Sequence, residues 1–191
     1  MRLITRLRTA SLLNTIWHHP HLLYGKGAVH EQSFERLLQR LDYATEYVRH
    51  PYGPNQWPDF HLTLDGRPQA IELKTTQTHT ISMGGTWPHR DCIYIISHTH
   101  TPRVMYMGAN GVADNGRITI VRGSDLIDEE AKEAYEDYRD TIYRMERIKT
   151  STMYLQPRIN LRIKIDMSRR REWYERTLQW IIEKPTSHNN Q

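Results

Sequence analysis

The chain has 191 residues, of which 38% are hydrophobic and 25% are charged, and its formal net charge is +4 at pH 7. This length allows one domain with a core that needs neither disulfides nor a structural metal. The mean hydropathy is −0.73, and no apolar run approaches the ~20 residues of a membrane span, which argues against a membrane protein. The single cysteine, Cys92, allows no disulfide within the chain and fits a reducing cytoplasm.

The N-terminal half predicts a helix followed by a β-hairpin. The first residues include arginines but lack the compact apolar stretch and cleavage site of a signal peptide. Apolar residues recur at spacings of three and four over 28–41, which favours an amphipathic helix. Two strand-like runs, 59–64 and 69–75, then flank an Asp-Gly pair, which is a hairpin signal.

The C-terminal half predicts strands over 92–97, 103–108 and 117–121, and then a long helix over 125–148. Acidic residues at the start of this helix and basic residues at its end complement the helix dipole. The helix is expected to bury one apolar stripe, made of Ile127, Ala131, Ala134, Tyr138, Ile142 and Met145. Residues 158–167 alternate between polar and apolar, which is typical of a half-buried strand, and a last helix is expected from Ser168 to about residue 184.

This order of elements predicts an α/β fold with a mixed β-sheet flanked by helices. We expect a single domain over 1–184, with its core at about 26–122 and a helix-strand-helix extension over 124–184. The remaining residues, 185–191, are expected to form a disordered tail.

The chemically informative residues lie on the predicted hairpin. Asp59 begins the first strand, and Glu72 and Lys74 point to the same side of the second strand because side chains two apart share a face. Cross-strand neighbours are about 5 Å apart, so Asp59 can reach Glu72. Two adjacent carboxylates repel unless a cation neutralises them, and Mg²⁺ suits carboxylate oxygens while keeping open positions for water and phosphate. A lysine beside such a metal can orient, or help to deprotonate, a water that attacks phosphorus.

Pro58-Asp59 and the run Ile71-Glu72-Leu73-Lys74 resemble the motif of the PD-(D/E)XK nuclease superfamily. The resemblance implies a restriction-endonuclease-like core. It also implies that Asp59, Glu72 and the backbone carbonyl of Leu73 bind Mg²⁺, for which Mn²⁺ would substitute, and that Lys74 is the catalytic lysine. Without this context, a Glu-Leu-Lys on a strand is usually a solvated ion pair worth under about 1 kcal/mol.

Two flanking segments extend the resemblance to about residues 26–97. The segment from Lys26 to residue 41 resembles the first helix of archaeal Holliday-junction resolvases, which selects Glu31 as a further catalytic and metal-binding residue, with Glu35 as second choice. The segment 75–97 resembles type II restriction endonucleases, except that two threonines replace the usual serines and two glycines replace the usual asparagine.

Several polar residues are candidates for DNA contacts. The three arginines at 169–171 sit poorly at the positive end of a helix dipole, which raises phosphate binding to an alternative as strong as a plain solvated helix start. The polar face of the strand over 158–167 could face either DNA or water. The full set of candidates is Lys26, Thr76, Gln77, Arg90, Arg162, Lys164, Arg169, Arg170 and Arg171. The eleven histidines match no zinc motif.

The sequence therefore predicts a cytoplasmic, Mg²⁺-dependent endodeoxyribonuclease acting on double-stranded DNA. The leading hypothesis is a type II restriction endonuclease, expected to be a homodimer that cuts a short specific sequence and leaves a 5′-phosphate and a 3′-hydroxyl. No membrane and no small-molecule cofactor are expected to take part. Two alternatives stay open: a structure-specific nuclease for junctions or repair, and a non-catalytic DNA-binding module of the same fold.

Overall fold

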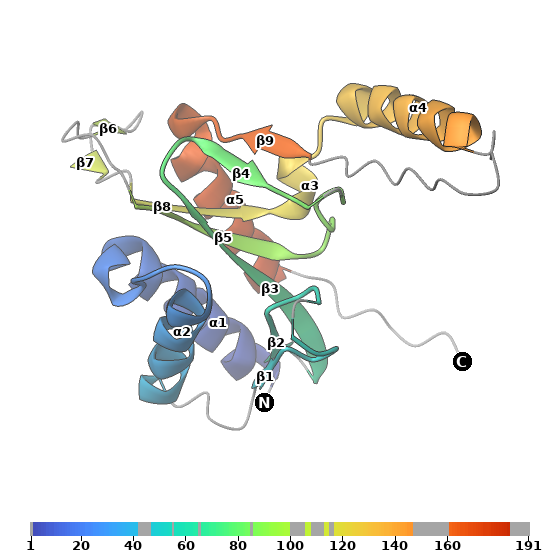
Figure 1. Cartoon of the computed structure of the whole chain (residues 1–191). Helices are drawn as coiled ribbons and strands as arrows, with labels where there is room; N and C mark the ends of the chain where they lie inside the picture. Colours follow the sequence, from blue (N-terminus) through green and yellow to red (C-terminus); the bar gives the residue numbers. More distant parts are fainter. Residues whose placement is uncertain are drawn as a thin grey trace.

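The computed structural model describes residues 2–41, 47–54, 56–64, 66–84, 86–99, 106–107, 113–114, 117–146 and 161–183, leaving aside the side chains of 2–4, 106–107, 113–114 and 142–146. A five-stranded sheet with strand order β1-β2-β3-β5-β8 lies at its centre (Figure 1). These strands are β1 (Tyr47–Arg49), β2 (Phe60–Leu64), β3 (Arg67–Thr76), β5 (Ile93–His98) and β8 (Ile118–Arg122). Only the β3–β5 pair is parallel, so the prediction of a mixed sheet flanked by helices is confirmed.

The predicted hairpin is β2 and β3. Phe60 lies opposite Ile71, and Leu64 lies opposite Arg67. Gly66 has a φ of +76°, the left-handed conformation that an Asp-Gly turn needs at its glycine. The turn therefore fixes the register of the hairpin. This register decides which residues of β3 lie opposite the start of β2.

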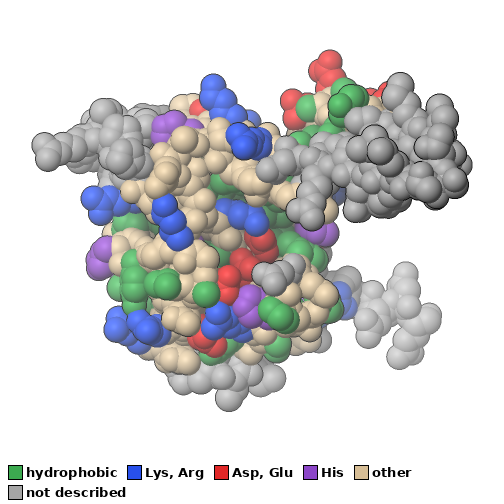
Figure 2. Space-filling model, viewed as in Figure 1, with side chains coloured by type: hydrophobic (Ala, Val, Ile, Leu, Met, Phe, Trp, Pro, Cys, Tyr) green, Lys and Arg blue, Asp and Glu red, His purple; other side chains and the backbone are tan. Residues whose placement is uncertain are grey.

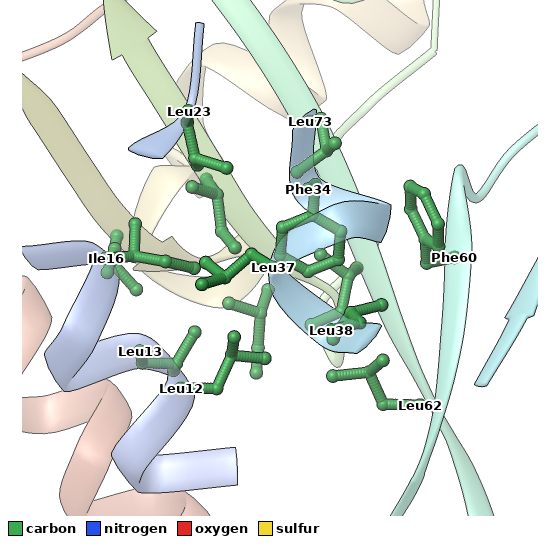
Figure 3. Packing of buried hydrophobic residues seen from close by; sticks show 14 of the residues in the cluster. Leu12, Leu13, Ile16, Leu23, Phe34, Leu37, Leu38, Phe60, Leu62 and Leu73 are labelled. Carbon is green, nitrogen blue, oxygen red and sulfur yellow. The ribbon is translucent and has the colours of Figure 1, made fainter. Parts of the chain in front are cut away.

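Three helices cover one face of the sheet: α1 (Arg2–His18), α2 (Ala28–Arg40) and α5 (Arg170–Glu183). Their apolar side chains meet those of β2 and β3 in the main core. Figure 3 shows the part of this core in which residues of α1 and α2 pack near Phe60, Leu62 and Leu73. Phe34 of α2 and Phe60 of β2 are fully buried, and their rings pack edge-to-face at 4.9 Å between centroids. The predicted helix over 28–41 is thus confirmed, and its apolar residues Phe34, Leu37 and Leu38 are buried, whereas Val29 of the same predicted face is 49% exposed. This packing fixes α2 against the hairpin.

The sequence did not predict α1. Its buried residues Leu12, Leu13 and Ile16 are accompanied by Leu7, which is 51% exposed, so its apolar residues do not form one narrow stripe. The helix lies against α5, β2 and β8, followed by the short 3-10 helix η1 (Pro20–Leu22). Contacts made far along the chain therefore decide the burial of this first helix.

A two-stranded ribbon, β4 (Thr80–Ser82) paired with β9 (Arg162–Lys164), covers part of the other face of the sheet. Within the predicted strand over 158–167, residues 162–164 form β9, whereas 158–160 lie outside the described residues. The expected alternation holds there, because Arg162 and Lys164 are exposed while Ile165 is buried. β9 pairs with β4 and is not a strand of the five-stranded sheet.

The predicted helix over 125–148 is two helices, α3 (Gly123–Leu126) and α4 (Glu129–Glu146). Ile127 between them is extended, and the Asp128 carboxylate accepts a hydrogen bond from the N–H of Ala131 at 3.2 Å, which caps a new helix start. The expectation of a buried stripe is wrong over the described part of α4, because Ala131 and Ala134 are exposed and Tyr138 is 58% exposed. In Figure 1, α4 projects away from the sheet, which explains this exposure.

The remaining short elements are η2 (Met167–Arg169) before α5, and the paired strands β6 (Tyr106–Met107) and β7 (Ala113–Asp114). The rest of the strand predicted over 103–108 and the tail predicted over 185–191 lie outside the described residues. Across the described part of the chain, no helix combines the length and the apolar character needed to cross a bilayer.

Candidate active site

Asp59, Glu72 and Lys74 converge where β2 begins. The N–H of Asp59 donates to Oε2 of Glu72 at 3.3 Å, and Oδ2 of Asp59 accepts from the N–H of Leu73 at 2.8 Å. Nζ of Lys74 donates to Oε1 of Glu72 at 2.6 Å. The Glu72 carboxylate therefore contacts the backbone of Asp59 and the side chain of Lys74, while the Asp59 carboxylate is held by the backbone of Leu73. Figure 2 shows acidic side chains next to basic ones near the middle of the viewed face.

The hairpin register produces this arrangement. Because Phe60 pairs with Ile71, Asp59 lies just beyond the end of the ladder, level with Glu72. Ile71 and Leu73 point into the helix-covered core, and this directs Glu72 and Lys74 to the opposite face. The N–H and C=O of one strand residue point to the same side, so the Leu73 carbonyl faces the side from which Asp59 approaches.

The electrostatics of the site are those of two carboxylates forced together. Burial, and then the charge of Glu72, raise the pKa of Asp59 from 3.8 to about 6, and Glu31 adds to the rise. The Leu73 N–H and the Lys74 ammonium act in the opposite direction without cancelling it. The pair therefore has an unmet demand for positive charge, which a divalent cation would meet.

Glu31 faces the site from α2 but is held by two basic groups. Its Oε2 accepts from Arg49 at 3.0 Å and lies 3.0 Å from Nε2 of His50. Arg49 also binds Glu35 at 2.9 Å, and Glu35 accepts from the hydroxyl of Tyr47 at 3.1 Å. Between the two candidate helix glutamates, Glu31 is the one whose charge acts on Asp59.

The sequence missed the two residues that hold Glu31. Arg49 lies on β1, and His50 follows it with a φ of 48° while its N–H donates to the carbonyl of Asp59 at 2.8 Å. No local pattern identifies them, because only the pairing of β1 with β2 brings them to α2. Both residues contact the Glu31 carboxylate and so reduce its availability as a metal ligand.

A stacked aromatic pair was also missed. The rings of Trp57 and His89 lie 3.6 Å apart between centroids and nearly parallel. Burial lowers the pKa of His89, while the charge of Glu72 opposes that shift. Trp57 precedes Asp59 by two residues, and the charge of Glu72 acts on His89, so the pair lies near the carboxylates.

The donor set fits Mg²⁺. Asp59, Glu72 and the Leu73 carbonyl offer only oxygen atoms, and Mg²⁺ in proteins is usually held by one or two carboxylates while keeping several waters. Within the described ranges, no group of three or more His, Cys, Asp or Glu side chains is arranged to hold a metal ion. The histidines His30 and His98 are buried and bonded to hydroxyls of Ser97 and Thr119, respectively.

The candidate DNA contacts divide into accessible and occupied groups. Arg170 is 1% exposed and donates to the hydroxyl of Thr119 at 3.0 Å, so its burial rules out a phosphate contact in this conformation. The Thr76 hydroxyl is used inside the β3–β4 turn, where it donates to the carbonyl of Thr80 at 2.8 Å. In this structure both side chains are therefore engaged by the protein's own polar groups.

The other candidates are on the surface. Arg90 pairs with Glu129, Arg169 with Glu172 at 3.4 Å, and Arg171 with Glu175 at 2.8 Å. Such exposed pairs contribute little to stability and can exchange partners. The exposed residues without such pairs among the described side chains are Lys26, Gln77, Arg162 and Lys164.

No protein-family model, no curated protein and no solved structure matches this chain. The described residues form an α/β fold with a mixed five-stranded sheet and a two-stranded ribbon flanked by helices.

Proposed function

We propose that this protein is a Mg²⁺-dependent endodeoxyribonuclease of the PD-(D/E)XK type. The observation that carries the proposal is that the Glu72 carboxylate accepts from the Asp59 backbone N–H at 3.3 Å and from the Lys74 ammonium at 2.6 Å, on the hairpin that carries the motif. The raised pKa of Asp59, about 6, supports it, because perturbed carboxylates concentrate at sites that bind a cation or transfer a proton. A solvated surface ion pair would not bury Glu72 to 8% exposure.

Each residue has a role that follows from its position. Asp59 and Glu72 present oxygens that would hold the ion, and the Leu73 N–H fixes the orientation of Asp59. Bound Mg²⁺ supplies polarisation of the phosphoryl oxygen and stabilisation of the leaving alkoxide. The Lys74 ammonium, anchored by Glu72, can donate a hydrogen bond to the attacking water or to a phosphate oxygen as charge builds up there.

The finer proposal is a type II restriction endonuclease that acts as a homodimer. The resemblance implies that its products carry a 5′-phosphate and a 3′-hydroxyl. A short chain with one site needs a second copy to cut both strands of a palindromic sequence, and twofold symmetry provides it. The chain's net charge of +4 suits a polyanionic substrate.

The test is digestion of long unmethylated duplex DNA, and of branched DNA, with and without Mg²⁺. Lys74→Ala is compared with Lys132→Ala, which removes the same charge from a solvent-facing position on α4. We expect cutting that requires Mg²⁺ or Mn²⁺, a loss of at least about 100-fold for Lys74→Ala, and no loss for Lys132→Ala.

The products distinguish the alternatives. Discrete bands from duplex DNA support sequence-specific cutting, and cutting of branched DNA alone supports a junction or repair nuclease. Binding of DNA without any metal-dependent cutting overturns the enzyme and leaves a binding module of the same fold.

A further inference from the structure

A second polar site adjoins the candidate active site along β3. A pocket of about 350 Å³ begins at Thr75, directly after Lys74, and follows the β3–β4 turn to Ser82. Its other walls are Lys26, which precedes α2, and Arg162 on β9. Segments from three parts of the chain therefore build one concave surface next to the catalytic lysine.

The pocket is held in shape by hydrogen bonds that the protein makes internally. The Thr76 hydroxyl accepts from the N–H of Thr78 at 3.1 Å and donates to the carbonyl of Thr80 at 2.8 Å. The carbonyl of His79 accepts from the N–H of Ile165 at 2.6 Å, which joins the turn to the end of β9. The turn is thus preorganised, and a ligand would not have to order it.

The charge of the pocket is uniformly positive. It is lined by Lys26 and Arg162, by hydroxyl groups and by the amide of Gln77, and no carboxylate is among its lining residues. Across the described residues, neither cation forms an ion pair, and both are exposed. Lys164 lies two residues from Arg162 on the same face of β9 and extends the positive surface. Two unpaired cations facing hydroxyl and amide groups suit a phosphate group.

We propose that this pocket binds a backbone phosphate of the DNA strand being cut, next to the phosphodiester held at Asp59, Glu72 and Lys74. The proposal rests on the nuclease function above and deepens it. Strand residues advance about 3.3 Å each, so Thr75 to Gln77 lie roughly 3 to 10 Å beyond Lys74. Successive nucleotides advance about 3.4 Å along the duplex axis, so the pocket is within about three nucleotide steps of the reacting phosphate. It would hold the strand in register for cutting.

The first experiment measures DNA binding without cutting. Binding of a labelled duplex is followed by fluorescence anisotropy in EDTA over a range of salt concentrations, for wild type, Lys26→Ala, Arg162→Ala and the control Arg40→Ala. Arg40 ends α2, about 20 Å along the helix from Lys26, and carries the same charge. Thermal melts verify that each variant folds, as exposed substitutions should.

We expect Lys26→Ala and Arg162→Ala each to weaken binding about tenfold, and to lower the slope of log K against log salt by about 0.9 for each lost phosphate contact. Lys26→Arg and Arg162→Lys should restore most of the binding, and Arg40→Ala should leave the slope unchanged.

The second experiment locates the phosphate. Around the mapped cleavage position, single phosphates are replaced by uncharged methylphosphonates. Wild type should lose affinity for one replacement within about three nucleotides of the cut, and the two alanine variants should be insensitive to that same replacement.

Either of two results overturns the inference. One is that both alanine variants bind DNA with the affinity and salt dependence of Arg40→Ala. The other is that inorganic phosphate binds at the pocket while the DNA affinity of the variants stays unchanged, which identifies a site for a free anion. If the protein binds DNA without cutting it, the nuclease function is overturned, and the salt dependence of binding by the variants still tests the pocket. No binding of any DNA overturns both.

Discussion

The carboxylate of Asp59 allows a test of the repulsion on which the site depends. Its pKa is raised from 3.8 to about 6, mainly by burial and then by Glu72. We predict that Asp59→Asn stabilises the metal-free protein at pH 7. Asparagine keeps an oxygen that can accept from the Leu73 N–H, and it removes the buried negative charge beside Glu72.

The size of the effect follows from the same pKa. A change from 3.8 to about 6 corresponds to about 3 kcal/mol of unfolding free energy at pH 7. Since Asp59 is only partly buried, solvent screening reduces this to about 1–2 kcal/mol, or a rise in Tm of roughly 3–7 °C.

The sign of the pH dependence is fixed. The Asp59 carboxyl group binds its proton more tightly in the folded state than in the unfolded state. The wild-type protein therefore loses stability relative to Asp59→Asn as the pH rises from 3.8 to about 6. The difference should be absent below this window and constant above it.

The assay is thermal unfolding in EDTA between about pH 4 and pH 8, with Asp91→Asn as the control. The Asp91 side chain is 83% exposed, so its substitution should produce no such window. Mg²⁺ at ten times its Kd should then stabilise wild type by about 1.4 kcal/mol and leave Asp59→Asn unchanged. An Asp59→Asn protein that unfolds below wild type in EDTA at pH 7, or that gains equally from Mg²⁺, would refute the reasoning.

Three further predictions concern the same site and its surroundings. The rate of DNA cutting should fall below about pH 6 as Asp59 becomes protonated. The midpoint of the pH–rate profile should move to lower pH as the Mg²⁺ concentration is raised, because the ion competes with the proton for the carboxylate. A midpoint that does not depend on the Mg²⁺ concentration contradicts this prediction. Glu31→Gln should slow cutting by less than about tenfold, because Arg49 and His50 already occupy Glu31; a loss as large as that of Asp59→Ala in single-turnover assays would make Glu31 a direct ligand. Arg170→Ala should destabilise the fold by about 3 kcal/mol in urea unfolding, since it removes a buried side chain that donates to Thr119 and packs over the Trp17 ring. Arg171→Ala, at a side chain that is 31% exposed, should change stability by under about 0.5 kcal/mol.

Local patterns were sufficient for the hairpin and for the faces of its strands. The Asp-Gly turn sets the register of β2 and β3, and alternation along β3 then separates Ile71 and Leu73 from Glu72 and Lys74. The contact of Asp59 with Glu72 follows from these two local rules, so it could be predicted without knowing the rest of the fold.

Long-range packing decided what these rules left open. Helix α1 is buried by α5, which comes about 150 residues later, and Trp17 stacks on Tyr174 at 4.4 Å between ring centroids. The apolar positions of α4 looked suited to burial, but the cap at Asp128 starts a helix that leaves the sheet. Periodicity gives a face to a helix and does not give it a partner.

The sequence by itself determined the chemistry: two carboxylates and an ammonium brought to one strand face by a turn of fixed geometry. Only the tertiary structure decided which groups surround them, because those contacts join residues distant in the chain. It pairs Glu31 with Arg49 and His50, buries Arg170 against Thr119, and brings Lys26 and Arg162 to the same pocket. Strand alternation is a property of neighbouring residues, whereas charge neutralisation and burial depend on every element that packs around them.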